Sequence, residues 1–479
     1  MNKEKQIQLS EEIQKSLKLL NYEKATPVQK EVIPLIFEGN DVIVKSQTGS
    51  GKTASFVIPL CEKLNWDNRK PQGLILAPTR ELVMQIEEDV HNIGRFKRIK
   101  VEAIYGRSSF QKQERSLREM THVIVATPGR LLDHIEKGTV DLSAIEYLVI
   151  DEADEMLNMG FIEQIEAILK HIPLAAQKML FSATMPESIT QLASNFLTKA
   201  KLIKIEAKNP VEKRITQHYV KTFEQDKKDA LGSLLINENP DTAIIFCNTR
   251  DEVEAVAHFL KPMVGQIKTL HGGQQQRFRT EIIQDFKKGV FRYLVATDVA
   301  ARGLDIEDIS LIINYDIPEN TENYTHRIGR SARIDKLGKA ISLVNSDQRF
   351  DFQSILDETA YTITEMILPK DEILAKKLPQ FTTKQNQKPT LKQRKDQKFS
   401  TEITKIHINA GKKTKMRAGD IVGAICDIEG LSADDIGVID ILDVSTFVEI
   451  LNNKGDLVLK HFETQPIKGR MRKVSRAYD

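Results

Sequence analysis

The chain has 479 residues, of which 41% are hydrophobic and 28% charged, and 69 Lys and Arg balance 67 Asp and Glu to a net charge of +2. The chain is longer than an ordinary domain with a single hydrophobic core, so we expect several domains. The apolar fraction excludes a largely disordered protein. A charge so close to zero argues against a uniformly basic nucleic-acid-binding surface. No apolar stretch reaches the roughly 20 residues of a membrane helix, the polar N-terminus does not resemble a signal peptide, and three widely spaced cysteines indicate a reduced, cytoplasmic protein.

The first part of the chain alternates short apolar runs with helical patterns. Short apolar runs flanked by turn residues are typical of buried parallel strands. The runs are 41–45, 73–77, 122–126, 147–150 and 179–181. Ligands of such sheets bind at the carboxyl ends of the strands, and the polar motifs of this chain follow these runs.

The same pattern restarts in the second part of the chain. Its apolar runs are 243–247, 293–296, 311–315 and 340–344. Pro and Asn interrupt the periodicity at 208–210, which indicates a hinge. We therefore predict an α/β protein with two parallel-sheet domains in tandem, over residues 1–207 and 208–370.

The composition changes after the second domain. Residues 375–400 hold 8 basic residues and 1 acidic residue, which leaves the rest of the chain at −5. Few of these residues can form a core, so we predict a basic flexible linker over 371–402. The overall charge of +2 hides this segregation, and its argument against nucleic acid fails. Residues 403–479 regain globular patterning in the order β-α-β-β-α-β, which predicts a small α+β, ferredoxin-like domain.

A Gly-rich segment follows the first predicted strand and opens a helix. It consists of Ser46, Gln47, Thr48, Gly49, Ser50, Gly51, Lys52 and Thr53. Glycines let backbone N–H groups close around phosphate oxygens at a helix N-terminus, where Lys52 would reach the outer phosphates and Thr53 would ligate Mg²⁺. Ser46 stands where the strict motif has its first Gly. The alternative is an ordinary Gly-rich turn before a helix.

Two carboxylates end the apolar run at 147–150. Asp151 can hold hydrated Mg²⁺ through water, and Glu152 can orient and deprotonate an attacking water. The alternative is an acidic loop on a solvated face. Together with the phosphate loop, this carboxylate pair predicts a nucleoside triphosphatase.

Arg330 and Arg333 lie three residues apart in the second domain. At this spacing they share one helical face, and cations there would stabilise charge on the γ-phosphate. The alternative is a solvated basic helix.

Together these motifs resemble those of the DEAD-box ATP-dependent RNA helicases, in the family's order, over roughly residues 1–365. The resemblance implies two RecA-like domains. It implies that Tyr22 stacks on adenine, that Thr26 and Gln29 read it, and that Gly303 and Asp305 contact ATP from the second domain. Residues that would couple hydrolysis to domain closure are Asp154, Ser182, Thr184 and His326.

The resemblance also implies RNA contacts from both domains. The matching positions are Thr79, Arg80, Gly106, Thr127, Arg130, Thr249, Arg250, Gly273, Gln276, Arg279 and Thr297. Glycine backbones, hydroxyls and arginines suit sugar and phosphate rather than base edges, so binding would be independent of RNA sequence.

The linker and small third domain resemble the bacterial DbpA subfamily. Its members bind a hairpin of 23S ribosomal RNA and act in large-subunit assembly, through a domain similar to an RNA-recognition motif. Candidate phosphate contacts are Lys412, Lys413, Lys415, Arg417, Arg470, Arg472 and Lys473; a solvated edge is the alternative. Phe447 and His407 are candidates for base stacking or for ordinary packing.

The sequence as a whole thus predicts a monomeric, cytoplasmic RNA helicase that uses ATP and Mg²⁺. Two other classes stay open at this point. A non-enzymatic RNA clamp would show no RNA-stimulated phosphate release, and a DNA-directed translocase would be stimulated by DNA as well as by RNA.

Overall fold

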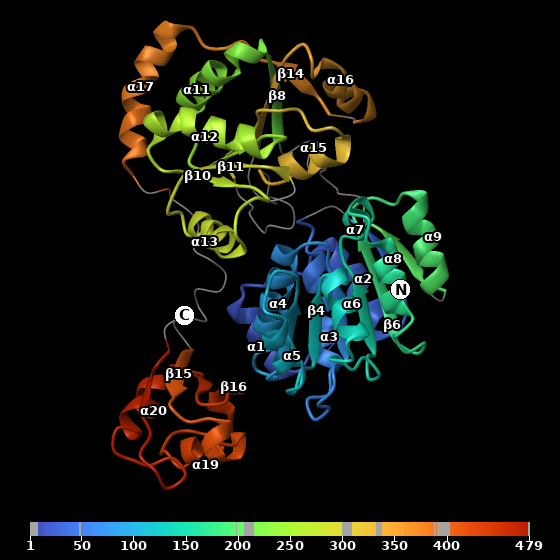
Figure 1. The fold of residues 1–479 in the computed structure, drawn as a ribbon, viewed down its shortest axis with the longest axis vertical. Coiled ribbons are helices and arrows are strands. Elements are labelled where there is room, and N and C mark those ends of the chain that lie inside the picture. The colour runs from blue at the N-terminus through green and yellow to red at the C-terminus, as the bar shows by residue number, and fades with distance from the viewer. Residues whose placement is uncertain are drawn as a thin grey trace. The chain divides into compact units, whose positions relative to one another are not determined.

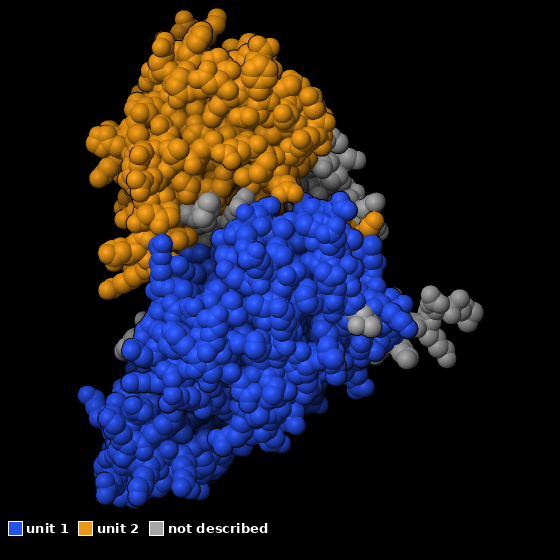
Figure 2. Space-filling view, turned by 45° about the vertical axis from the view of Figure 1, so that its right-hand side comes forward, with its two compact units in different colours: residues 1–44, 51–203, 393–479 blue, residues 45–50, 204–392 orange. Residues whose placement is uncertain are grey.

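The computed structural model describes residues 8–46, 49–197, 199–205, 215–298, 309–331, 338–359, 361–387, 389 and 403–477. The chain forms two compact units (Figure 2). The first unit holds residues 1–44, 51–203 and 393–479, and the second holds residues 45–50 and 204–392. Three sheets lie in the described residues, two of seven strands and one of four. None of the described helices is long and apolar enough to cross a membrane.

The first domain is built on a seven-stranded sheet with the order β3-β4-β2-β5-β6-β1-β7. Its central strands β2 and β4 are buried at every position and pair in parallel, as their continuous apolar runs predict. The strands are β1 Val42–Lys45, β2 Gly73–Leu76, β3 Val101–Ile104, β4 Val123–Ala126, β5 Tyr147–Ile150, β6 Gln177–Ser182 and β7 Lys201–Lys204. The helices are α1 Glu11–Leu19, α2 Pro27–Phe37, α3 Lys52–Lys63, α4 Arg80–Gly94, α5 Phe110–Leu117, α6 Pro128–Glu136, α7 Ala153–Asn158, α8 Ile162–Leu169 and α9 Glu187–Phe196.

The second domain repeats this architecture with the strand order β10-β11-β9-β12-β13-β8-β14, and its described strand pairs are all parallel. Apolar clusters cover both faces of the sheet. The strands are β8 Ile215–Lys221, β9 Ala243–Phe246, β10 Ile267–Leu270, β11 Tyr293–Ala296, β12 Leu311–Asn314, β13 Gly338–Val344 and β14 Ile363–Glu365. The helices are α11 Lys227–Glu238, α12 Arg250–Val264, α13 Gln276–Lys287, α15 Thr321–Ile328, α16 Arg349–Glu358 and α17 Asp371–Gln385. The prediction of two tandem RecA-like domains is confirmed.

Helix α17 corrects the predicted linker. Residues 371–385, expected to be flexible, form a helix that packs on α11 of the second domain (Figure 1). Phe381 is buried among the apolar side chains of that domain, and the half-buried Lys377 and Lys384 donate hydrogen bonds to Asn237 and Asn239 at the end of α11. One large apolar residue and two bonded lysines therefore hold a segment whose average composition is polar. The rest of the predicted linker lies almost wholly outside the described residues, as does the hinge expected at 208–210.

The C-terminal domain confirms the predicted β-α-β-β-α-β order. Its elements are β15 Thr404–Ile408, α19 Ala418–Cys426, β16 Ile436–Ile441, β17 Thr446–Ile450, α20 Gly455–His461 and β18 Val474–Arg476. The antiparallel sheet has the order β16-β17-β15-β18. Ile406, Ile408, Val448 and Ile450 point into the core with the helices, so the alternate residues of β15 and β17 lie on the other face.

Candidate functional site

The order of the first sheet sorts the predicted site residues into two groups. Strands β3, β4 and β2 are neighbours and lead into the segments of the predicted RNA contacts. Strands β5, β6 and β1 lead into those of the predicted ATP and coupling residues. Because the carboxyl ends of parallel strands share one edge, both groups lie along the same edge of the sheet.

The Gly-rich loop has the backbone that a phosphate site requires. Gly51 has a φ of +91°, and a Cβ there would lie 2.8 Å from the side-chain amide nitrogen of Gln29. The positive φ and this short distance both oppose a residue larger than glycine at position 51. Gly49 also has a positive φ, of 71°, and the Ser46 hydroxyl donates to the Ser50 hydroxyl at 2.8 Å. Gln47 and Thr48 lie outside the described residues.

Lys52 and Thr53 occupy the first turn of α3, directly after this loop. The Lys52 side chain is 7% exposed, and its ammonium group has no hydrogen-bond partner among the described residues. A buried cation without a partner costs free energy, which an anion bound at the helix N-terminus would recover. The loop therefore fits a phosphate group.

Thr26 and Gln29 begin α2 with a reciprocal pair of hydrogen bonds. The Gln29 side-chain oxygen accepts the Thr26 N–H at 2.9 Å, and the Thr26 hydroxyl accepts the Gln29 N–H at 3.5 Å. The Gln29 amide nitrogen also donates to the carbonyl of Gly51 at 3.2 Å. The segment expected to read adenine is thus bonded to the phosphate loop. Tyr22, expected to stack on the base, is half-buried just before it.

The carboxylate pair follows β5 as predicted. Asp151 is 3% exposed, and burial raises its pKa to about 7, opposed by the positive charge of Lys52. Its Oδ1 accepts the N–H of Glu152 at 3.0 Å. Glu152 is half-buried with a left-handed φ of 51° at the start of α7.

A divalent cation would fit beside Asp151, because it would stabilise the ionised form that burial disfavours. The described residues contain no group of three or more His, Cys, Asp or Glu able to hold a metal ion. Mg²⁺ would suit a site beside one carboxylate and a phosphate loop, because it keeps several of its waters and binds proteins through one or two oxygen ligands together with phosphate.

The predicted coupling residues of the first domain contact one another. Asp154 Oδ2 accepts hydrogen bonds from the N–H groups of Ala183 and Thr184 and from the Thr184 hydroxyl, at 3.1, 2.7 and 2.9 Å. The Asp154 N–H donates to the Ser182 hydroxyl at 3.3 Å. The carboxylate motif after β5 and the segment after β6 therefore form one hydrogen-bonded unit.

The predicted RNA residues of the first domain meet at the ends of β2, β3 and β4. Thr79 caps α4 by accepting the Leu82 N–H at 3.2 Å, and the guanidinium of Arg80 lies 3.8 Å from where a Cβ of Gly106 would stand. The Thr127 N–H donates to the Ile104 carbonyl at 2.9 Å, and Arg130 lies over the ring of Phe110 at 5.7 Å. Hydroxyls, a glycine and two arginines thus share one patch.

The predicted RNA residues of the second domain also lie at strand ends and helix starts. Thr249 caps α12 at the Glu252 N–H, and the exposed Arg250 pairs with Asp251 at 3.2 Å. Thr297 follows β11, and its N–H donates to the Leu270 carbonyl at the end of β10. Gly273 precedes α13, on which Gln276 and Arg279 lie one turn apart.

Sequence reasoning missed one central residue, Arg327. It is 1% exposed, and its guanidinium makes two 2.6 Å hydrogen bonds to Asp298 and one of 2.9 Å to the side chain of Asn248. The pattern His-Arg-Ile-Gly-Arg contains it, but the predicted roles fell on His326 and Arg330, which are half-buried on either side. Gly303, Asp305 and Arg333 lie outside the described residues.

The basic residues of the C-terminal domain gather in two neighbouring loops. Lys468 ties the loops together, donating to the Lys415 carbonyl at 2.8 Å and to Asp420 at 2.7 Å. The Asn409 N–H bonds to the Lys473 carbonyl at 2.9 Å. Exposed side chains of these loops are Lys412, Lys413, Lys415, Arg417, Arg470 and Lys473, with Arg472 half-buried. The Lys412 ammonium pairs with Glu119.

His407 and Phe447 face each other across β15 and β17 on the face away from the helices. They are a registered pair with ring centroids 5.1 Å apart, and both are half-buried. Lys405 lies 5.7 Å from the Phe447 centroid. Rings and a cation on one face of a sheet can stack on unpaired bases.

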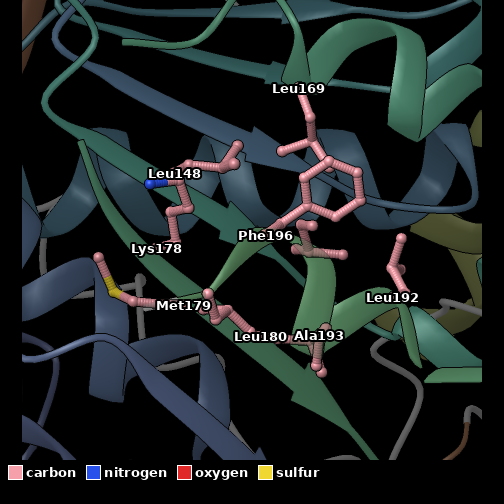
Figure 3. A pocket seen from close by; sticks show the side chains of 10 residues that line it. Leu148, Leu169, Lys178, Met179, Leu180, Leu192, Ala193 and Phe196 are labelled. Atoms are coloured by element: carbon pink, nitrogen blue, oxygen red, sulfur yellow. The ribbon is translucent and has the colours of Figure 1, made fainter. Parts of the chain in front are cut away.

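A small pocket of the first domain lies apart from these residues (Figure 3). Leu148 and Leu180 of the sheet, Leu169 of α8, and Leu192 and Phe196 of α9 line it. Its side chains are apolar except for Lys178, so it offers few groups for chemistry.

Comparison with protein families finds three matching models. The DEAD/DEAH box helicase model matches residues 26–192, the helicase conserved C-terminal domain matches 226–335, and the DbpA RNA binding domain matches 405–476. The matched regions include each of the described motifs from Thr26 onward.

Known relatives extend the match over the whole chain. An ATP-dependent RNA helicase DbpA of Bacillus subtilis is 48% identical over 99% of both chains, and a DEAD-box ATP-dependent RNA helicase CshA of Geobacillus kaustophilus is 45% identical over 70% of this chain and 72% of its own. Among solved structures, S. cerevisiae Dbp5 bound to RNA and ADP BeF3 matches 78% of this chain and 98% of its own, with a TM-score of 0.69 and 30% identity. The chain belongs to the DEAD-box ATP-dependent RNA helicases, in the bacterial DbpA subfamily, and is an RNA-stimulated ATPase that carries a DbpA RNA-binding domain.

Proposed function

We propose that this helicase unwinds short duplexes within a hairpin region of 23S ribosomal RNA during assembly of the large ribosomal subunit. It would act as a cytoplasmic monomer, held on its substrate by the C-terminal domain. The observation that carries the proposal is the pair of basic loops at 412–417 and 468–473, joined by Lys468, on a domain that matches the DbpA RNA-binding model.

In the proposed site, ATP binds to the first domain through the phosphate loop, with Tyr22, Thr26 and Gln29 around the base. Lys52 holds the outer phosphates, because its buried ammonium group otherwise has no hydrogen-bond partner among the described residues. Thr53 and Asp151 would hold Mg²⁺, Thr53 through its hydroxyl and Asp151 through water. Mg²⁺ would supply charge stabilisation at the phosphates.

Glu152 is the proposed general base of hydrolysis. Its place directly after Asp151 at a strand end puts a carboxylate beside the proposed phosphate and metal site. The second domain would supply Gly303 and Asp305 to the nucleotide, and Arg330 and Arg333 to the γ-phosphate. Asp154, Ser182, Thr184 and His326 would couple hydrolysis to the movement of the domains.

RNA would bind along the sugar-phosphate backbone at the strand ends of both RecA-like domains. The supporting feature is the clustering of Thr79, Arg80, Gly106, Thr127 and Arg130 at one edge of the first sheet. Hydroxyls, glycines and arginines contact phosphate and sugar without reading sequence. The targeting to one RNA would then come from the C-terminal domain.

The test is ATPase stimulation across defined RNA fragments, with and without the ribosomal hairpin. Deleting residues 401–479 is expected to leave an ATPase that needs much more RNA and no longer prefers the hairpin. The double variant Lys413→Glu, Lys415→Glu should act in the same direction, because reversed charges repel phosphate. Lys376→Glu, exposed on α17, is the matched control for a reversed surface charge. Unchanged discrimination after the deletion would refute the targeting role.

A further inference from the structure

Lys227 is a fully buried cation that belongs to none of the motifs. It lies in the first turn of α11 and is 0% exposed. Its ammonium group donates to Asp316 Oδ1 at 2.6 Å and to the side-chain oxygen of Gln348 at 3.4 Å, and it lies over the ring of Tyr315 at 4.5 Å. Buried ion pairs persist only where further hydrogen bonds satisfy both partners, so the other contacts of Asp316 matter.

Asp316 passes this contact on to Asn248. Its second oxygen accepts the Asn248 N–H at 3.0 Å, and its backbone carbonyl accepts a hydrogen bond from Arg327 at 2.5 Å. The Asn248 side chain donates to the Ile317 carbonyl and accepts from Arg327, both at 2.9 Å. Asn248 is therefore fixed through its N–H and both side-chain groups.

Arg327 completes the network by pairing with both oxygens of Asp298 at 2.6 Å. Two buried ion pairs, Lys227–Asp316 and Arg327–Asp298, thus meet at Asn248. They join the ends of β9, β11 and β12 to helices α11 and α15. We name this set of five residues the Lys227–Arg327 network.

The network borders the proposed contacts on both substrates. Asn248 directly precedes Thr249 and Arg250, and Asp298 directly follows Thr297, which are proposed RNA contacts. Arg327 stands between His326 and Arg330, which are proposed to act in coupling and at the nucleotide. A rigid, fully bonded network of this kind can hold both sets in one arrangement.

We propose that Lys227 is a positioning residue for RNA-stimulated ATP hydrolysis. Through Asp316 it fixes the backbone at Asn248, and with it the RNA-contacting end of β9 and the side chain of Arg327. The inference rests on the proposed RNA contacts of Thr249, Arg250 and Thr297.

Removing the charge of Lys227 should disturb this arrangement without touching either substrate. In Lys227→Met the Asp316 carboxylate would lose the cation that pairs with it. It must then take up a proton or turn toward water, and either change weakens its bond to the Asn248 N–H. Networks of this kind modulate coupling between sites by amounts that correspond to about 2- to 30-fold in an equilibrium constant.

The experiment measures ATPase rate against RNA concentration in the full-length chain. Lys227→Met is expected to raise the half-saturating RNA concentration about 2- to 30-fold, with the affinity for a fluorescent ATP analogue unchanged. The control is Lys221→Met, which breaks a 2.8 Å ion pair with Glu365 that is largely exposed in the same domain. It should leave both quantities at their wild-type values.

A purely structural role would give a different result. Partial unfolding lowers the maximal rate and leaves the half-saturating RNA concentration unchanged. That result in Lys227→Met would overturn the proposal. Asp316→Asn keeps an oxygen for the Asn248 N–H but loses the charge, and it should shift half-saturation in the same direction. It also carries the test if Lys227→Met does not fold.

The double variant Lys227→Met, Asp316→Asn should shift half-saturation by less than the combined single shifts, because both residues act through one network. Independent, additive shifts would overturn the inference. If no RNA stimulates the wild-type chain, the proposed RNA contacts fail instead. If RNA stimulates the wild type and Lys227→Met leaves the half-saturating RNA concentration unchanged, the inference about Lys227 fails while the proposed RNA contacts stand.

Discussion

The carboxylate of Asp154 binds Thr184 twice, accepting the backbone N–H at 2.7 Å and the hydroxyl at 2.9 Å. A third hydrogen bond, from the Ala183 N–H, reaches the same oxygen. The end of the carboxylate motif and the segment after β6 are therefore tied together. A displacement of Asp154 is passed to Thr184 without an intermediary.

Thr184→Ala removes the hydroxyl bond and keeps both backbone bonds. We expect stability to fall by about 1 kcal/mol, the usual net value of one hydrogen bond. Duplex unwinding should fall more than RNA-stimulated ATPase, because the coupling contact is weakened and the proposed catalytic groups are not. Thr184→Ser, which retains the hydroxyl, is the control. Equal losses of unwinding and ATPase would contradict the coupling role.

Glu152→Gln should bind ATP and RNA as the wild type does and lose turnover. The amide keeps the size of the side chain but cannot accept a proton, and a general base contributes roughly 10²–10⁴-fold. Single-turnover phosphate release measures this loss directly. Glu163→Gln, on the exposed side of α8, should retain full activity. Full RNA-stimulated hydrolysis by Glu152→Gln would remove Glu152 from the role of base.

Asp151 gives the nucleotide-free protein a pH-dependent stability. Burial raises its pKa to about 7 in the folded chain, against about 3.9 for an unfolded aspartate. The folded chain therefore keeps a proton that the unfolded chain releases, so the contribution of Asp151 to stability falls as pH rises from about 4 to about 7. Asp151→Asn should be more stable than wild type by about 4 kcal/mol at pH 8 and similar to it at pH 4.

Thermal unfolding in the presence of a chelator, over this pH range, tests the Asp151 prediction. The chelator matters because a bound divalent cation would favour the ionised carboxylate. Parallel stability curves for the two proteins would contradict it. Asp151→Asn is also expected to lose Mg²⁺-dependent ATPase activity. This loss does not distinguish a change in stability from the loss of the proposed Mg²⁺ contact.

Lys52→Met should stabilise the fold while it abolishes nucleotide binding. The ammonium group is buried without a hydrogen-bond partner among the described residues, which costs about 1–3 kcal/mol, and a methionine has similar length and no charge. Without ligand the variant should melt at a higher temperature than wild type, and added ATP should no longer raise its melting temperature. Lys30→Met, on the exposed side of α2, should change neither quantity. A lower melting temperature of Lys52→Met would show that the group is satisfied in the apo protein.

The central strands of both sheets could be predicted from the sequence because burial on both faces demands continuous apolar runs. Strands β3, β7, β10 and β14 could not, because each lies at a sheet edge and is partly exposed. Strand β8 has the mixed sequence Ile-Thr-Gln-His-Tyr-Val-Lys, which breaks the pattern although it lies inside the sheet. Helix α17 was hidden by the average composition of its segment.

The candidate site divides in the same way. Residues that follow or end an apolar run, such as Asp151 or Ser182, are recognisable because strand ends collect functional groups. Lys227 and Asp316 are not, since 89 positions separate them and each resembles a surface charge in the sequence. Only the fold shows that both are buried and paired. Asp316 directly follows the apolar run at 311–315, and this position is the one signal that could have drawn attention to it.

The side-chain amide of Gln29 bonds both the start of α2 and the phosphate loop at Gly51, so the proposed reading of adenine by Gln29 would bear directly on the shape of the loop. A nucleobase bound to this amide would also act on the hydrogen bond between Gln29 and Gly51 that holds the loop in shape. The selection of the base and the positioning of the phosphates would then depend on the same side chain. Discrimination between ATP and another nucleoside triphosphate should accordingly appear in kcat as well as in Kd, because the wrong base would slow turnover as well as weaken binding.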